Sequence, residues 1–150
     1  YDTTLGGNGN FDWNPVATGY SRFWIWLLGR CTDNAQFSQV AMFLNGDKTL
    51  TNYYNRDNDA GAILNNPTIG FVSGATADSN AWSFITIFLP AYSQAIRQPA
   101  LTIQSNVPVT TNFDLGLHAW RWQTAAVVTR IQIEDASAIN SFTDFAGRLG

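Results

Sequence analysis

Charge is scarce in this chain, and lysine is nearly absent. Charged residues make up 13% of its 150 residues, about half the usual share of a soluble globular domain. Lys48 is the one lysine, and the formal net charge is -3. Such a chain cannot neutralise a row of phosphates, so we expect no direct binding to nucleic acid. The same charge balance argues against attachment to an anionic membrane surface.

Cysteine and long apolar runs are also missing. The single cysteine, Cys31, excludes an internal disulfide and a cysteine-rich zinc site. The longest unbroken apolar run, 23–28, is far shorter than the roughly 20 residues that a membrane-spanning helix needs, and no signal-peptide pattern precedes it. We therefore expect a soluble protein. We treat 1–150 as one domain, and either end of this sequence could be truncated.

Alternation with a period of two is abundant, and it predicts an all-β chain. In 22–28 and 83–89 both alternating sets are apolar, which predicts strands covered on both faces. Segments rich in Gly, Asn, Asp and Pro separate the runs and predict turns and loops. Seven or eight strands of this kind favour an antiparallel two-sheet β-sandwich, of jelly-roll type. The predicted strands are 22–28, 37–44, 83–89, 101–105 and 126–133, with edge strands at 68–72 and 118–123.

The sequence Asn45-Gly46-Asp47 directly follows an apolar strand. Asn and Gly both tolerate positive φ, so this tripeptide is foremost a structural turn. Asn52 and Tyr53 then lie on the returning segment, where an Asn side chain can tie the loop by bonding backbone groups.

The order of several short motifs resembles a structural domain of tailed-bacteriophage virions. An aromatic start, a tyrosine before a hydrophobic strand, an arginine, and FNGD followed by NY form the signature of that family. The matching residues here are Phe11-Asp12, Tyr20-Ser21, Gly29-Arg30, Phe43 to Asp47 with Leu44 inserted, Asn52-Tyr53, and, downstream, 85–92 and 125–131. Ala91 stands where the family usually has aspartate, and the family's terminal strand is missing after Gly150, which fits truncation.

This resemblance implies a non-enzymatic virion component on a β-sandwich or jelly roll, assembled as a homotrimer. Relatives include tail-fibre, minor tail and head-accessory proteins, so the resemblance leaves the place on the particle open. It implies no cofactor.

Candidate catalytic and metal sites each have a simpler interpretation. Asp57 and Asp59 alternate as in a calcium loop, with Asp47 as the best additional ligand, but the spaced third acid and the glutamate of such a loop are missing. We therefore favour a solvated acidic loop and predict no metal and no catalytic residue. His118 is the only histidine and is interpreted as an ordinary strand residue. Glu134 and Asp135 are adjacent, so they point to opposite faces of a strand and cannot act as a catalytic pair.

The tryptophans offer binding surface instead. Trp120 and Trp122 share a strand face with His118, with Arg121 opposite, and such a row suits the core, a subunit interface or a sugar-stacking platform equally well. We interpret Trp24 and Trp26 as core residues. Arginine pairs well with carboxylates across interfaces, which makes interface candidates of Arg30, Arg97 and Arg130.

The first functional hypothesis is therefore a phage structural protein on the particle surface, with a slight preference for a capsid decoration (cement) protein over a tail fibre. Its partners would be copies of itself and other virion proteins such as the major capsid or tail proteins. The second is a receptor-binding or carbohydrate-binding domain that uses exposed tryptophans and takes a host surface glycan. A hydrolase has the least support, because no triad or carboxylate pair can be assembled from the sequence.

Overall fold

In the computed structural model, the described part of the chain is all-β. The structure describes residues 2–9, 11–16, 19–31, 34–57, 64–77, 81–109, 112–135 and 142–149; at 2–9, 57, 106–109, 112–114 and 142–149 it describes the backbone alone. Within these ranges there are eleven strands, one 3-10 turn and no α-helix. The strands are β1 (Asp2–Gly9), β2 (Phe11–Trp13), β3 (Phe23–Cys31), β4 (Phe37–Leu44), β5 (Tyr53–Asp57), β6 (Thr68–Ser73), β7 (Ser83–Leu89), β8 (Ile96–Val109), β9 (Asn112–Ala126), β10 (Ile131–Asp135) and β11 (Phe142–Leu149), and η1 (Leu50–Asn52) lies between β4 and β5.

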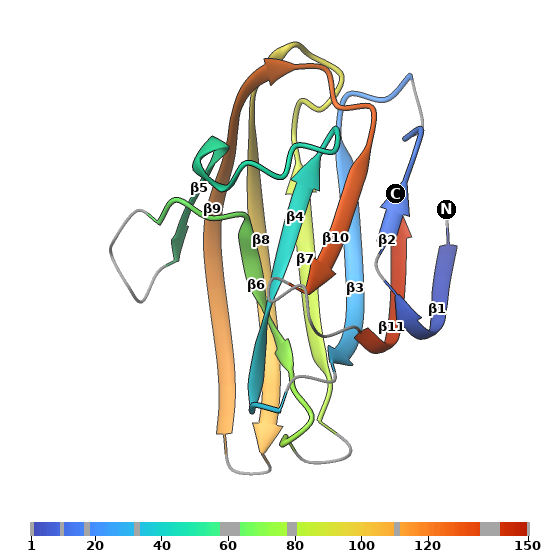
Figure 1. Ribbon diagram of the computed structural model, residues 1–150, viewed down its shortest axis with the longest axis vertical. Helices are drawn as coiled ribbons and strands as arrows, with labels where there is room; N and C mark the ends of the chain where they lie inside the picture. The colour runs from blue at the N-terminus through green and yellow to red at the C-terminus, as the bar shows by residue number, and fades with distance from the viewer. Residues whose placement is uncertain are drawn as a thin grey trace.

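The strands form one continuous hydrogen-bonded path. Its order is β2-β10-β4-β6-β3-β7-β8-β9-β5, with β11 also paired to β3 and β1 paired to β11. The connection between β6 and β3 is a single parallel residue pair, Arg30 with Ser73. Every other strand pair is antiparallel, as in β3 with β7 and β8 with β9. Figure 1 shows β4 and β10 passing in front of β3 and β7.

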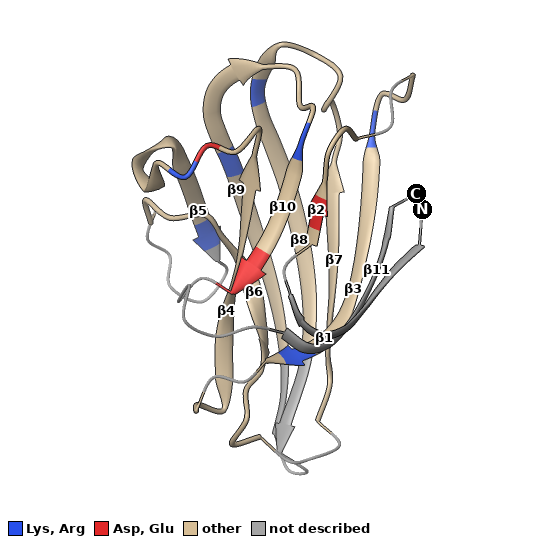
Figure 2. Cartoon of the chain, turned by 45° about the vertical axis from the view of Figure 1, so that its right-hand side comes forward, with Lys and Arg blue, Asp and Glu red and all other residues tan. Residues whose placement is uncertain are grey.

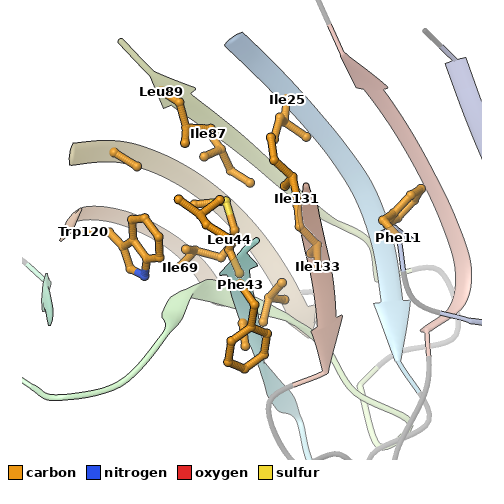
Figure 3. Close-up of a cluster of buried hydrophobic side chains, with 14 of the residues drawn as sticks. Phe11, Ile25, Phe43, Leu44, Ile69, Ile87, Leu89, Trp120, Ile131 and Ile133 are labelled. Carbon is orange, nitrogen blue, oxygen red and sulfur yellow. The ribbon is translucent and has the colours of Figure 1, made fainter. Parts of the chain in front are cut away.

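The core lies between these strands and follows the alternation of the sequence. On β3 and β7 every second residue is buried, and so are residues 40–44 of β4 and Ile131 and Ile133 of β10. Figure 3 shows Ile25 and Ile87 in the same cluster as Leu44 and Ile131. Burying an aliphatic side chain of this size contributes about 1.5–3 kcal/mol, so this shared cluster is the main source of stability.

Buried polar residues also shape the inner face of β8 and β9. The Gln104 side chain fills the space that Gly70 and Gly116 leave open, and its Oε1 accepts a hydrogen bond from the Phe71 N–H at 2.7 Å. A Cβ at Gly70 would lie 2.5 Å from that oxygen, and Gly70 also has φ of 155°. Glycine is therefore required where β6 crosses the inner face of β8.

Several predicted strands have the expected limits, and others do not. β4 and β7 coincide with the predictions for 37–44 and 83–89, whereas 126–133 is not one strand: β9 ends at Ala126, residues 127–130 form a loop, and β10 begins at Ile131. Segment 118–123, predicted as an edge strand, lies in the middle of β9, between β8 and β5.

The prediction that β3 and β7 are covered on both faces is wrong. Phe23, Ile25 and Leu27 are buried, but Trp24 is 39% exposed, Leu28 is exposed and Trp26 is half-buried. The interpretation of Trp24 and Trp26 as core residues fails for the same reason. Both alternating sets are apolar because one set faces the core and the other forms an apolar outer surface.

Candidate functional site

The turn after β4 is held by the side chain of Asn45. Asn45 and Gly46 both have positive φ, 54° and 73°. Asn45 Oδ1 accepts hydrogen bonds from the backbone N–H groups of Thr129 (2.7 Å) and Arg130 (3.1 Å), and its Nδ2 donates to the Val127 carbonyl at 2.8 Å. The chain between β9 and β10 is thereby fixed, which explains why the apolar segment 126–133 is interrupted by a loop.

Asp47 anchors the other side of the same turn. Its Oδ2 accepts hydrogen bonds from Trp122 Nε1 at 2.9 Å and Asn52 Nδ2 at 2.8 Å, and its Oδ1 accepts one from the Thr49 N–H at 3.0 Å. The buried Tyr53 hydroxyl donates to the Asp47 carbonyl at 2.7 Å and accepts from the Leu44 N–H at 3.2 Å. Asn52 and Tyr53 thus tie the turn as its returning segment, but β5 pairs with β9 rather than with β4.

These contacts determine the charge state of the turn. Partial burial would raise the pKa of Asp47, but the hydrogen bonds from Trp122, Asn52 and Thr49 outweigh it, and the pKa lies below its ordinary value. Burial raises the pKa of Tyr53, which keeps the phenol neutral. An ionised Asp47 is therefore part of the folded structure, and its oxygens already have N–H partners.

The weaker calcium alternative gains no site from this geometry. Asp47 accepts hydrogen bonds with both oxygens, Asp57 ends β5 with only its backbone described, and Asp59 lies outside the described residues. Among the described side chains, no three of His, Cys, Asp or Glu gather to hold a metal ion.

The remaining carboxylates of the described part are engaged on the β2 and β10 side of the molecule. Arg130 donates to both oxygens of Asp12, at 2.9 and 2.6 Å, and this hydrogen bonding lowers the pKa of Asp12. Lys48 pairs with Glu134. Ser38 donates to the buried Asp135 at 2.5 Å. Arg130 is thus in an intramolecular ion pair, which leaves it unsuited to the interface role suggested by the sequence.

The predicted platform of Trp120, Trp122 and His118 does not reach the surface. Each of these three side chains is 2% exposed. Trp120 Nε1 donates to the Pro67 carbonyl at 3.2 Å, and its ring lies 5.3 Å from that of Tyr53. The His118 ring lies 6.1 Å from that of Phe71. Of the three roles open to Trp120 and Trp122, the structure gives them the core, because they lie on the inward side of β9.

The opposite, outward side of β9 and of the neighbouring strands carries large apolar side chains. Three cross-strand rows run over β3, β7, β8 and β9, and residues paired directly across strands share a face. We call these twelve outward positions the outer apolar face: Trp24, Phe88, Leu101 and Ala119 in the first row, Trp26, Thr86, Ile103 and Leu117 in the second, and Leu28, Phe84, Ser105 and Leu115 in the third.

Large apolar side chains of this face are open to solvent. Exposure reaches 46% for Ile103, 47% for Leu117 and 60% for Leu115. The rings of Trp24 and Phe88 stack with centroids 4.4 Å apart, and the planes of Trp24 and Trp26 differ by 8°. The sequence contained this signal as apolar residues in both alternating sets, which we interpreted as burial on two sides.

Charged residues lie around the outer apolar face and not within it. Among the residues whose side chains the structure describes, the charged residues of its rim are arginines, and every acidic side chain lies elsewhere, on β2, β10 or the turn after β4. In Figure 2, β7 is tan along its whole length, whereas the ends of β3 and β8 carry blue. The five rim residues are Arg22, Arg30, Arg56, Arg97 and Arg121.

Arg97 and Arg121, predicted as interface residues, are thus exposed at the rim, and the Arg121 guanidinium lies 5.4 Å from the Tyr54 ring centroid. Arg30 Nη2 donates to the Gly74 carbonyl at 3.2 Å.

Within the described ranges, no helix has the length and apolar character that a membrane span requires.

Comparison with known proteins adds no family. No protein-family model matches the chain, and no curated protein matches it. Similar solved structures include the CBM40 module of the Ruminococcus gnavus IT-sialidase bound to α2,3-sialyllactose, with 8% identity, 88% of each chain covered and a TM-score of 0.29. The SPRY domain of human HERC1 is 12% identical, with 90% of this chain and 88% of that chain covered and a TM-score of 0.25. At these scores neither likeness bears on the fold or function of this chain.

Proposed function

We propose that the protein is a non-enzymatic structural component of a bacteriophage virion, located on the particle exterior. It would be a capsid decoration (cement) protein, or a related head or tail accessory protein, that binds neighbouring virion subunits and copies of itself. The order of the phage-like motifs from Phe11 to Tyr53 supports the setting, and the homotrimer is what that resemblance implies.

The outer apolar face is the observation that carries this proposal. The largest apolar patch of an ordinary monomer covers about 300–600 Å² and is often functional. Seven large side chains of this face, on β3, β7, β8 and β9, are each 39–60% exposed, and the adjoining Trp82 is 38% exposed. A surface of this kind is suited to adhesion, because the free energy falls when another surface covers it and removes it from water.

The proposed fold in finer terms is a two-sheet sandwich of jelly-roll type. Strands β2, β10, β4 and β6 would form one sheet, and β3, β7, β8, β9 and β5 the other, with β11 and β1 beside β3. Two observations support this division: one residue pair connects β6 to β3, and the buried side chains of both strand sets belong to one cluster.

The mechanism would be binding energy summed over many copies. On a particle surface, contacts that are weak one by one become strong together through a high effective concentration. The polar residues of the turn contribute to rigidity, since Asn45 and Asp47 are bonded within the chain. A rigid binding surface loses little entropy when it docks.

A second candidate, a receptor-binding or glycan-binding domain, is favoured by one specific observation. Trp24 and Trp26 present nearly parallel rings on the outside of β3, and flat aromatic rings stack on sugar faces. Titration with glycans, followed by tryptophan fluorescence, tests this candidate. Saturable quenching that is lost in Trp24→Ala and kept in Trp82→Ala would favour it over the structural role.

Electron microscopy of intact particles tests the virion proposal directly. Gold-labelled antibody against the purified protein should decorate the outside of particles of the phage that encodes this chain, and the chain should be found by mass spectrometry in particles purified on a gradient. Absence of the chain from purified particles would overturn the proposal.

A further inference from the structure

We propose that the outer apolar face is covered by the same face of other copies of this chain. This inference rests on the proposed function in one respect, since it names the surface through which the protein would bind itself. It concerns the twelve positions on β3, β7, β8 and β9 and no part of the turn around Asn45 and Asp47.

The exposed area is near the amount that a stable interface needs. If each large side chain is taken at about 200 Å², a value within the range for aromatic residues, the seven exposed side chains of the face, at 39–60% exposure, leave roughly 600 Å² of apolar surface. Standard protein interfaces bury about 800 Å² on each partner. One face meeting the same face of another copy therefore supplies a standard interface without any rearrangement.

The centre of the face contains no charged group. Ten of its twelve positions are apolar, and the other two are the hydroxyl residues Thr86 and Ser105. Burying a charge without a partner is costly, and no such cost arises here. Flat antiparallel sheet faces pack in this way about 10 Å apart, with aliphatic and aromatic side chains between them.

The width of the face limits how many copies can meet. Four strands spaced about 4.8 Å apart make a face about 19 Å wide. Two faces pack directly. Three faces around a threefold axis would each lie about 5.5 Å from that axis, close to half of the ~10 Å spacing between packed sheets, so side chains fill the centre. Four faces would lie about 10 Å from the axis and leave a hole, so the assembly has two or three copies.

The arginine rim gives this assembly an unusual dependence on salt. Pairing equal faces brings the arginine side chains of neighbouring copies to a shared periphery, where like charges repel. Raising the salt concentration from 0.1 M to 1 M shortens the Debye length from about 10 Å to about 3 Å and screens that repulsion. The affinity of self-association should therefore increase as salt is raised, whereas the affinity for an acidic protein or an anionic lipid surface would decrease.

The experiment measures self-association of the full chain by sedimentation velocity at several protein and sodium chloride concentrations. The wild type should form a species of two or three times 16.5 kDa, tighter in high salt. Ile103→Lys places a cation at the centre of the face and should raise the dissociation constant at least about 100-fold. Leu50→Lys is the matched control, because Leu50 is 55% exposed on η1, off the face, and it should associate as the wild type does.

Each outcome decides the matter. Circular dichroism and thermal unfolding establish that Ile103→Lys is folded, and Leu117→Thr serves in its place if it is not. A wild type that stays monomeric at about 100 μM, association that weakens with salt, equal association of Ile103→Lys and the wild type, or binding of the monomer to phosphatidylserine vesicles would overturn the inference. A protein that is monomeric but present on particles overturns this inference and leaves the proposed function standing. A protein that is oligomeric but absent from particles supports this inference and overturns the proposed function.

Discussion

Asn45 and Asp47 are two residues apart, yet they stabilise different parts of the molecule. Asn45 bonds the loop between β9 and β10, and Asp47 bonds Trp122 in β9 and Asn52 in η1. The turn itself follows from the Asn-Gly sequence, because both residues accept positive φ. The partners at Thr129 and Trp122 could not be predicted, since they are 84 and 75 residues away and leave no local pattern.

Two substitutions at position 45 separate side-chain bonding from backbone strain. Asn45→Gly keeps the positive φ and loses the side-chain hydrogen bonds, so it should lower the free energy of unfolding by about 1–3 kcal/mol. Asn45→Ala should lower it by about 1 kcal/mol more, because alanine is strained at φ of 54°. Urea unfolding measures both. Equal stability of Asn45→Gly and the wild type would show that the side chain does not hold the loop.

Asp47 should make the protein acid-sensitive. Its pKa is lowered in the folded state, so its contribution is complete above its unfolded pKa of about 3.9 and disappears as the pH falls through the folded value. Asp47→Asn should cost about 1–2 kcal/mol at neutral pH and flatten the decline of stability between about pH 5 and pH 2.

Urea unfolding at a series of pH values checks this expectation for Asp47. Trp122→Phe keeps an aromatic ring and removes one hydrogen-bond donor to Asp47, so its pH profile should lie between those of the wild type and Asp47→Asn. Parallel pH profiles for the wild type and Asp47→Asn would contradict the proposed charge state.

At the scale of strands, alternation predicts where strands lie better than which faces are covered. The limits of β4 and β7 could be predicted because apolar residues recur there and turn residues follow them. Two-sided apolar character in β3 and β7 did not mean burial on both sides, since the sequence does not distinguish a core from a surface awaiting a partner. The short strands β2 and β5 carry too few residues for a period to emerge.

Neighbouring residues on β7 provide a direct test of sidedness. Ile85 is fully buried and Phe84 is 42% exposed on the outer apolar face. Ile85→Ala should lower the free energy of unfolding of the monomer by about 2–5 kcal/mol, because it leaves a cavity. Phe84→Ala should lower it by less than about 1 kcal/mol while weakening self-association.

Urea unfolding at low protein concentration and sedimentation at high concentration measure these two effects separately. Destabilisation of the monomer by Phe84→Ala to the same extent as by Ile85→Ala would mean that the outer apolar face is covered within one chain.

At the scale of the whole molecule, the all-β class followed from the sequence and the order of the strands did not. Periodicity is a local property, whereas β10 lies between β2 and β4 and β9 lies between β8 and β5 because of packing across the core. The distribution of charge was equally hidden. Asp12 precedes the rim arginines in the sequence and Glu134 and Asp135 follow them, and folding brings these acidic residues together on the β2 and β10 side, away from the outer apolar face.

The arginine rim allows the charge of the assembly to be tuned. Arg97→Glu replaces one rim cation by an anion that can pair with arginines of the neighbouring copy. At 0.1 M salt its self-association should be several-fold tighter than that of the wild type, and its dependence on salt should be smaller. Sedimentation velocity measures both quantities, and Leu50→Glu, on η1 and off the outer apolar face, is the control. Weaker association of Arg97→Glu at low salt would place the rim outside the interface.

The pairing of β2 with β10 has a consequence during protein synthesis. Asp12 of β2 pairs with Gln132 of β10, so about 120 further residues must be synthesised after β2 before its partner strand exists. At 5–20 residues per second this takes roughly 6–24 s, during which the nascent chain exposes the apolar segment of β3. We expect ribosome-bound chains that end before β9 to be captured by chaperones, and release to follow only when the last third of the polypeptide has left the exit tunnel.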